Sequence, residues 1–263
     1  MTRRRLDVEL VRRHLARSRE QAQEYISAGQ VLVAGMVATK AATQVDENAA
    51  IKVKVDAQDD YVSRGAHKLI GALEAFPVQV EGRIALDAGA STGGFSDVLL
   101  RRAIGHIYCV DVGYGQLAWK VSQDERVTVI DRTNVRHLTP DLLGSTVDLI
   151  VADLSFISLE TVLPALNSVL RPQGDALLMV KPQFEVGREA LGEGGVVDSP
   201  ALRVAAVHKI ATKAFSLGLG TAGVVASPLP GPSGNVEYFL WLRRDAEAPE
   251  ESAIIQAVEE GPA

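Results

Sequence analysis

Short apolar runs alternate with amphipathic stretches through most of the chain. Seven of these runs have the length of buried β-strands and lie at residues 84–88, 106–112, 127–131, 147–152, 176–181, 222–226 and 236–242. Four stretches with helical periodicity lie before and between them, near residues 66–75, 93–103, 158–169 and 201–217. Because strands and helices alternate, the pattern predicts an α/β fold built on a mostly parallel sheet.

The first 55 residues have a different pattern, which predicts a small α+β module. Asp7 is placed to cap a first short helix, and residues 18–21 form a capping box for a second helix that ends at Gly29. Short β-type runs follow at residues 31–33 and 51–55. We therefore expect four parts: a domain over residues 1–58, a linker over 59–63, a larger domain over 64–244, and an acidic tail over 245–263.

Composition limits the setting in which the protein works. The 263 residues are 47% apolar, which is enough for a packed core, and Cys109 is the single cysteine, so no intramolecular disulfide can form. No apolar stretch approaches the ~20 residues of a membrane span, and no hydrophobic signal region follows the N-terminal arginines. These features predict a cytoplasmic protein.

Charge is divided unevenly along the chain. The first 55 residues contain 10 Lys and Arg against 6 Asp and Glu, whereas the remaining 208 contain 17 against 27. A basic module on a chain with a net charge of −6 indicates a local surface that binds a polyanion.

The segment IALDAGASTGGF, residues 84–95, is typical of a cofactor site. A strand ends at Asp87, a glycine-rich turn follows, and a helix begins, while Gly89 and Gly93 lack a Cβ and let the backbone approach a ligand. The spacing Asp-x-Gly-x-x-x-Gly resembles the S-adenosyl-L-methionine loop of Rossmann-like methyltransferases. Asp111 ends the next apolar run, where a carboxylate can accept both ribose hydroxyls. The residues expected to bind this cofactor are Gly89, Ala90, Ser91, Thr92, Gly93, Asp111, Val112, Asn134 and Asp153.

Four charged residues are expected at one edge of the sheet. Ligands of such folds bind beyond the carboxyl ends of the parallel strands. Asp153 and Lys181 each follow one of these strands, and Glu237 begins the last strand, which reaches the same edge if it runs antiparallel. Lys68 lies on the helix before the cofactor strand, in SRGAHKL.

These four residues match the Lys-Asp-Lys-Glu tetrad of ribose 2′-O-methyltransferases of the FtsJ/RrmJ type. That resemblance implies a Rossmann-like seven-stranded sheet whose last strand is antiparallel. The segments LDAGASTGGF, DVGYGQLAW, VADLSFISL, VKPQFEVG and PGPSGNVEYFLW share it.

The N-terminal module resembles the S4 RNA-binding domain. The matching features are Arg5-Leu6-Asp7, Ser18-Arg19, Ala22, Ile26 and Gly29-x-Val31-x-Val33. One departure is Ala34-Gly35, where S4 domains usually have Asn-Gly. With both domains, the chain resembles the TlyA (hemolysin A-like) family of rRNA methyltransferases over roughly residues 3–243.

The resemblance implies transfer of a methyl group from S-adenosyl-L-methionine to a cytidine 2′-hydroxyl of ribosomal RNA within ribosomal subunits. The arginine-led N-terminus is similar to the mycobacterial-type members, which implies both 16S and 23S rRNA as substrates. Residues 59–62, Asp-Asp-Tyr-Val, depart from the Arg-x-Trp-Val linker of those members.

The chemistry suits the residue types of the tetrad. A ribose hydroxyl is a weak nucleophile, so methyl transfer needs an in-line approach to the sulfonium and a destination for the proton. Lys181 is the candidate to contact the hydroxyl, either as a neutral base or as a charged group that stabilises the developing alkoxide. Asp153 and Glu237 would orient the two lysines. The sequence leaves both roles of Lys181 open.

Basic, aromatic and hydroxyl side chains are expected to contact RNA, with Phe156 placed to stack on a flipped base. These residues are Arg3, Arg5, Arg17, Arg19, Lys40, Arg64, Arg132, Arg136, Phe156, Arg188 and Ser233. The histidines have no metal-ligand spacing with Cys109, so we expect no metal. The oligomeric state is left open.

Three other functions fit the sequence less well. A base N-methyltransferase would use the segment Asp153-Leu154-Ser155-Phe156, but both prolines of the Asp-Pro-Pro-Tyr loop are absent and the lysines have no role there. A membrane-active hemolysin is disfavoured, because the sequence predicts neither a membrane span nor a strongly amphipathic basic helix. A non-catalytic RNA-binding or assembly protein would not need an intact cofactor loop and tetrad.

Overall fold

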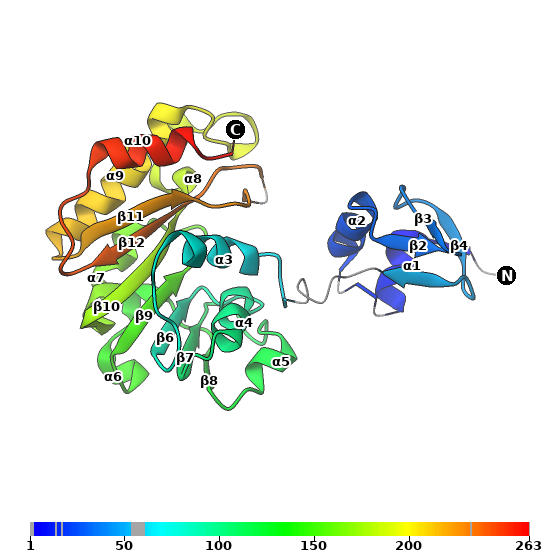
Figure 1. Cartoon of the computed structure of the whole chain (residues 1–263), viewed down its shortest axis with the longest axis horizontal. Helices are drawn as coiled ribbons and strands as arrows, with labels where there is room; N and C mark the ends of the chain where they lie inside the picture. The colour runs from blue at the N-terminus through cyan, green and yellow to red at the C-terminus, as the bar shows by residue number, and fades with distance from the viewer. Residues whose placement is uncertain (1–2, 14, 17, 54–60, 232, 263) are drawn as a thin grey trace. The chain divides into compact units, whose positions relative to one another are not determined.

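The computed structural model describes residues 3–13, 15, 16, 18–53, 61–231 and 233–262. The chain folds as two compact units, Met1–Asp60 and Tyr61–Ala263 (Figure 1). Residues 61–63, at the end of the predicted linker, pack on the second unit: the Val62 N–H donates to Asp97, and the Arg101 guanidinium lies 4.0 Å from the centre of the Tyr61 ring.

The first unit packs two helices against two small antiparallel sheets. The helices are α1 Leu6–Arg12 and α2 Arg19–Ser27. The strands are β1 Arg3–Arg5, β2 Val31–Val33, β3 Met36–Val37, β4 Gln44–Asp46 and β5 Ile51–Val53, paired as β1-β4 and β3-β2-β5. Leu6 and Leu10 of α1 meet Ala22 and Ile26 of α2 in its core. The predicted α+β module is confirmed.

Helix α1 begins before the residue predicted to cap it. Arg5 is its N-cap, and Asp7 lies in the first turn, so the prediction that Asp7 caps the helix is wrong. The Asp7 carboxylate instead accepts hydrogen bonds from arginine side chains. Ser18 caps α2 as expected, because its hydroxyl accepts the Gln21 N–H at 3.2 Å.

The departure from the usual Asn-Gly of S4 domains lies in the turn between β2 and β3. Val33 pairs with Met36, so Ala34 and Gly35 form a two-residue hairpin turn. Their φ angles are +50° and +83°, as a type I′ turn requires. Asparagine tolerates this left-handed backbone better than alanine, so Ala34 adopts a less favourable conformation here.

The second unit is built on a seven-stranded sheet in the order β11-β12-β10-β9-β6-β7-β8 (Figure 1). The strands are β6 Ile84–Ala88, β7 His106–Val110, β8 Val127–Ile130, β9 Val147–Ala152, β10 Leu170–Val180, β11 Gly220–Ala226 and β12 Tyr238–Arg243. From β10 to β8 all neighbours are parallel, whereas β12 runs antiparallel to β10 and β11. The predicted fold, including its antiparallel last strand, is confirmed.

Helices cover both faces of this sheet because its strands bury side chains on both sides. Ala85 and Cys109 face a core that includes α3 Ala66–Ala75 and α4 Gly94–Arg101. Leu86 and Val110 face the opposite core. The helices on that second face are η1 Val135–His137, α6 Pro140–Leu143, α7 Leu159–Val169, α9 Pro200–Ser216 and α10 Glu251–Glu259.

The acidic tail is part of the folded unit. The Thr221 N–H of edge strand β11 donates to the carbonyl of Glu247 at 2.9 Å. Helix α10 then places Ile254 and Val258 in the core shared with α9. The tail therefore covers the edge of β11, which would otherwise offer unpaired backbone groups to another chain.

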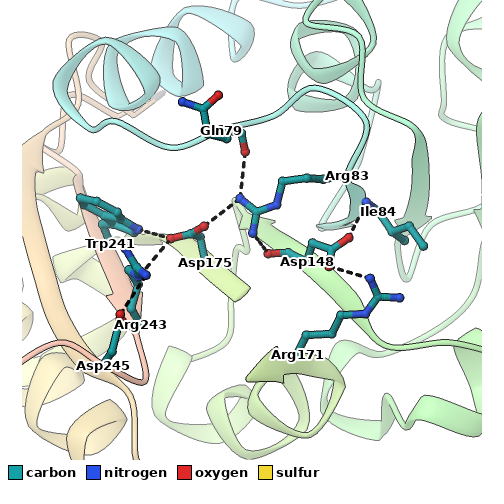
Figure 2. Close-up of polar contacts among 9 residues, drawn as sticks. All are labelled: Gln79, Arg83, Ile84, Asp148, Arg171, Asp175, Trp241, Arg243 and Asp245. Atoms are coloured by element: carbon teal, nitrogen blue, oxygen red, sulfur yellow. Dashed lines mark hydrogen bonds and ion pairs between the residues drawn. The ribbon is translucent and has the colours of Figure 1, made fainter. Parts of the chain in front are cut away.

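A polar network ties together the amino ends of the parallel strands (Figure 2). Arg83, just before β6, donates to Asp175 at 2.7 Å, to the Gln79 carbonyl at 2.8 Å and to the Asp148 carbonyl. The other oxygen of Asp175 accepts the indole N–H of Trp241 at 2.7 Å. Asp175 thus joins β10 to β12 and to the segment before β6.

Asp148 extends this network to β9. Its carboxylate accepts from the Ile84 N–H at 3.0 Å and from Arg171 at 2.6 Å. Burial raises the pKa of Asp148, but the Ile84 hydrogen bond and the charges of Arg171 and Arg83 outweigh it, so the pKa lies below its ordinary value.

Replacing Asp175 with alanine should lower the free energy of unfolding of the second unit by about 2–4 kcal/mol, because Arg83 and the Trp241 indole lose their shared acceptor. Both tryptophans lie in this unit, so denaturant unfolding followed by tryptophan fluorescence measures it selectively. The control is Asp245→Ala, since Asp245 also pairs with Arg243 but is 71% exposed and should change stability by less than about 0.5 kcal/mol. Equal effects of the two substitutions would contradict a stabilising network at Asp175.

Candidate active site

Strand register brings the four predicted tetrad residues together. Val180, the last residue of β10, pairs with Tyr238, the first residue of β12. Lys181, which follows Val180, and Glu237, which precedes Tyr238, therefore lie side by side at the edge of the sheet. Asp153 follows Ala152, which pairs with Leu178 of β10. All three therefore lie at the carboxyl edge of the parallel strands.

The four side chains form a chain of ion pairs. Lys181 Nζ lies 2.5 Å from Asp153 Oδ1, and Lys68 Nζ lies 4.0 Å from Asp153 Oδ2 and 2.5 Å from Glu237 Oε2. Both lysines are buried, and Glu237 is fully buried. Gly231 allows this packing, because a Cβ there would lie 2.6 Å from Glu237 Oε1. Asp153 links the two lysines.

Ser155 is a member of this site that the sequence analysis missed. Its hydroxyl lies 2.9 Å from Lys181 Nζ, so Lys181 contacts both Asp153 and Ser155. A polar residue two positions after a strand-ending acid was the available signal, since the same edge rule that selected Asp153 applies to Ser155.

The glycine-rich loop has the geometry of a ligand-binding turn. Gly89, Ser91 and Gly93 have φ angles of +85°, +47° and +91°. The two oxygens of Asp111 accept the N–H groups of Ser91 at 2.8 Å and of Gly113 at 2.7 Å. The Asp111 carboxylate is therefore held in place with lone pairs that can still accept the hydroxyls of a ribose.

The glycines at positions 89 and 93 also allow close packing within the protein. A Cβ on Gly89 would lie 2.7 Å from the Asp153 carbonyl oxygen, and one on Gly93 would lie 2.8 Å from a Leu117 methyl. The missing side chains thus allow the loop to pack against the next strand end and against Leu117.

A cavity of about 890 Å³ lies beside the loop. Of the residues predicted to bind the cofactor, those that line it are Gly89, Ser91, Asp111, Val112, Asn134 and Asp153. Ala90 is buried, Thr92 is exposed, and the Gly93 backbone faces Leu117. Lining residues that the sequence analysis did not select include Gly113, Gln116, Val135, Leu154, Ile157 and Thr161.

The predicted RNA contacts are distributed over both units. Arg136 and Phe156 line the cavity, and Arg132 lies 4.2 Å from the centre of the exposed Tyr114 ring. Arg64 and Ser233 are exposed. The remaining predicted contacts on the first unit are Arg3, Arg5, Arg19 and Lys40, while Arg17 and the Arg188 side chain lie outside the described residues.

Strained backbone is concentrated around the cavity. The described residues include five non-glycine positions with positive φ, and three of them, Ser91, Arg132 and Phe156, surround the cavity or its rim. Phe156 has a φ of +63° and is 91% exposed, with its ring 5.3 Å from that of Phe184. Such conformations persist only where the surroundings enforce them, and they mark functional sites.

Comparison with known proteins identifies the family. The FtsJ-like methyltransferase profile matches residues 61–244, and the S4 domain profile matches residues 4–51. The 16S/23S rRNA (cytidine-2′-O)-methyltransferase TlyA of Mycobacterium tuberculosis is 56% identical over 98% of each chain. The chain belongs to the TlyA family of FtsJ-like methyltransferases.

Other relatives of this TlyA-family protein bear a different name. Hemolysin A of Brachyspira hyodysenteriae is 34% identical over 84% of this chain and 92% of its own. A solved structure named as a hemolysin, from Streptococcus thermophilus, superposes with a TM-score of 0.78 at 36% identity and covers 99% of this chain and 96% of its own. Within the described residues, no helix is long and apolar enough to cross a membrane, and no cluster of His, Cys, Asp and Glu could hold a metal ion.

Asp87, at the end of β6 in this TlyA-family site, is a buried acid of unusual character. One of its oxygens accepts the N–H and hydroxyl of Ser96 at 3.0 and 2.6 Å, and the other is buried without a hydrogen-bond partner. Burial, reinforced by the charges of Asp153 and Asp111, raises the pKa of Asp87 to about 7. The Ser96 hydroxyl also contacts the Cys109 thiol at 3.0 Å, and burial raises the pKa of that thiol.

Asp87 should make the second unit less stable as pH rises. Its folded pKa lies above the unfolded value near 4, so its contribution to stability is complete below about pH 4 and lost as pH rises through about 7. Asp87→Asn cannot ionise and should remove this decline, which is of the order of a few kcal/mol. Denaturant unfolding by tryptophan fluorescence between pH 4.5 and 8 measures the difference. Parallel curves for the two proteins would show that Asp87 ionises normally in the folded state.

Proposed function

We propose that the protein is an S-adenosyl-L-methionine-dependent methyltransferase that modifies cytidine 2′-hydroxyls in ribosomal RNA. The observation that carries this proposal is the Lys68–Glu237/Asp153–Lys181 chain of ion pairs beside the cofactor-sized cavity. The name of the M. tuberculosis relative supports both 16S and 23S rRNA as substrates. The S4 domain supports RNA within ribosomal subunits as the partner, in the cytoplasm where ribosomes work.

The residues around the cavity fit the proposed cofactor. Asp111, held by two backbone N–H groups, suits a ribose diol, and the open, half-apolar wall near Val112 and Val135 suits an adenine ring. The unpartnered oxygen of Asp87 adds an acceptor in the same region. When bound, S-adenosyl-L-methionine supplies an electrophilic methyl group on a sulfonium.

The geometry favours one of the two roles considered for Lys181. An ammonium has three N–H donors. One bonds the Ser155 hydroxyl, and the Asp153 carboxylate lies 2.5 Å away as an ion pair, so Lys181 keeps donor capacity for the target oxygen. Lys181 in this state orients the hydroxyl and stabilises negative charge developing on its oxygen. The hydroxyl proton would pass to water at the cavity mouth as this charge develops. The oxygen would then take the methyl group as the S–C bond of the sulfonium breaks, which leaves a neutral thioether.

The other tetrad residues position Lys181 and limit its movement. Asp153 forms an ion pair with Lys181 through one oxygen and with Lys68 through the other, while Glu237 pairs with Lys68. Base N-methylation gives these buried lysines no task, which disfavours that alternative. Phe156, exposed and held in a strained conformation at the rim, is placed to stack on the extruded cytosine.

Lys181→Ala should reduce methyl transfer by about 10²–10⁴-fold and leave binding to ribosomal subunits nearly unchanged, because an alkoxide stabiliser acts in the transition state. Radiolabel from S-adenosyl-L-methionine should enter rRNA of unmodified subunits and appear in an alkali-resistant dinucleotide. Label in alkali-labile nucleotides would indicate base methylation, and no label with folded, cofactor-bound protein would indicate a non-catalytic member.

Ser155→Ala should lower the single-turnover rate by about tenfold, because Lys181 loses one of the two contacts that fix its direction. Ser155→Thr keeps a hydroxyl and should restore most of the rate. Calorimetry with S-adenosyl-L-methionine provides the control, since the cofactor affinity of both variants should match that of the original protein. A rate unaffected in Ser155→Ala would exclude this positioning role.

A further inference from the structure

Two carboxylates of the first unit are fully buried among arginines. Asp7 and Glu9, in the first turn of α1, are both inaccessible to solvent. Glu9 binds Arg12 through two hydrogen bonds of 2.6 and 2.8 Å and Arg13 through one of 2.7 Å. Each carboxylate thus has more than one cationic partner.

The arginines around Glu9 include one with a structural task. Arg13 donates to the backbone carbonyls of Asp46, Glu47 and Ala49, at 3.2, 2.7 and 2.6 Å. It therefore fastens α1 to the turn between β4 and β5. The Glu9 group therefore stabilises the packing of α1 on this turn.

In the Asp7 group both arginines face the solvent, whereas Arg13 of the Glu9 group is only 21% exposed. Arg5 binds Asp7 with Nε and Nη2, both at 3.0 Å, and Arg19 binds it with Nη2 at 3.1 Å. Gln23 and the Val8 N–H complete the shell at 3.1 and 3.0 Å. The Arg5 and Arg19 side chains remain 44% and 55% exposed.

This arrangement leaves donors available on both guanidiniums. Each guanidinium has five N–H groups, and these hydrogen bonds to Asp7 use two of them on Arg5 and one on Arg19. A guanidinium edge matches a phosphate in geometry and charge. The Arg5 hydrogen bond, against the effect of burial, holds the pKa of Asp7 far below its usual range, so Asp7 is ionised at any working pH.

We propose that Asp7 is a positioning residue that holds Arg5 and Arg19 in a fixed pair for contact with phosphates of the RNA substrate. This inference rests on the proposed RNA-binding function of the first unit. Arg5 precedes α1 and Arg19 begins α2, so Asp7 fixes guanidiniums from two segments relative to one another.

Neutralising Asp7 has two opposing effects on the affinity for RNA. Removing the Asp7 charge strengthens attraction to RNA, but one unit charge about 7 Å from a phosphate in water changes affinity by less than about 3-fold, and salt screens it further. Losing the ordering of a long side chain costs roughly 2- to 12-fold in affinity for each of the two arginines. Positioning therefore outweighs charge.

The test is the affinity of the full-length Asp7→Asn protein for purified, unmodified ribosomal subunits across a salt series. We expect about tenfold weaker binding with a shallower log–log salt slope, although the protein gains positive charge. The matched control is Glu47→Gln, which makes the same charge change at an exposed position on the β4–β5 turn and should bind equally or slightly more tightly. Binding by Asp7→Asn as tight as the control, or tighter, would overturn the proposal.

A second variant decides the matter if Asp7→Asn unfolds the first unit, which amide hydrogen exchange would reveal. Arg5→Lys keeps the charge and leaves Asp7 bound to Arg19, Gln23 and the Val8 N–H, but it removes the two-bond fork. We expect it to weaken binding several-fold, and unchanged affinity would refute positioning. Arg5→Ala separates this from failure of the proposed contact: weaker binding by Arg5→Ala alone would show that Arg5 binds RNA without needing the fork, and unchanged affinity in both variants would show that Arg5 does not contact the RNA.

Discussion

The site depends on burying two lysines and Glu237 together with the half-buried Asp153 at the carboxyl edge of the sheet. Burying one such charge alone is prohibitive, and the cost is met only because each partner lies within an ion pair. The antiparallel entry of β12 makes this possible, since it brings Glu237 next to Lys181 and within reach of Lys68. A parallel β12 would place Glu237 at the opposite edge.

The two edges of the sheet use charge differently. At the amino edge, Arg83, Asp148 and Asp175 are paired with one another and with backbone groups, and this network ties four strands together (Figure 2). At the carboxyl edge, Asp153 and Lys181 adjoin an open cavity. One edge is suited to rigidity and the other to contact with ligands, as expected where binding residues are positioned by a stable scaffold.

Much of this architecture could be predicted from sequence. The spacing of apolar residues identifies strands and helices, and polar residues that follow parallel strands lie at one edge of the sheet. Strands β6 and β9 match their apolar runs residue for residue, and the tetrad follows from where strands end. Strand β10 begins at Leu170, earlier than predicted. Leu170 pairs with Val147 and Asp175 pairs with Leu149, and the mostly polar residues between them form an irregularity that an apolar pattern does not reveal.

Side-chain partners could not be predicted in the same way. The sequence suggests that Asp7 caps a helix. In the fold its carboxylate instead accepts hydrogen bonds from the side chains of two arginines and a glutamine in separate segments. Ser155 belongs to the site through a contact with Lys181, 26 residues along the chain. The sequence predicts that Gly89 and Gly93 let a ligand approach, but their close fit against the Asp153 carbonyl and Leu117 is visible only in the fold. Such facts depend on tertiary contacts that local sequence does not encode.

The burial of Cys109 has a practical consequence. The thiol is enclosed in the core beside Ser96 and Asp87, and its raised pKa keeps it in the unreactive protonated form. Maleimide dyes should therefore not react with the native protein. A single new cysteine on the surface of each unit would accept a fluorophore selectively, so energy transfer could measure the distance between the two units without first removing any native residue.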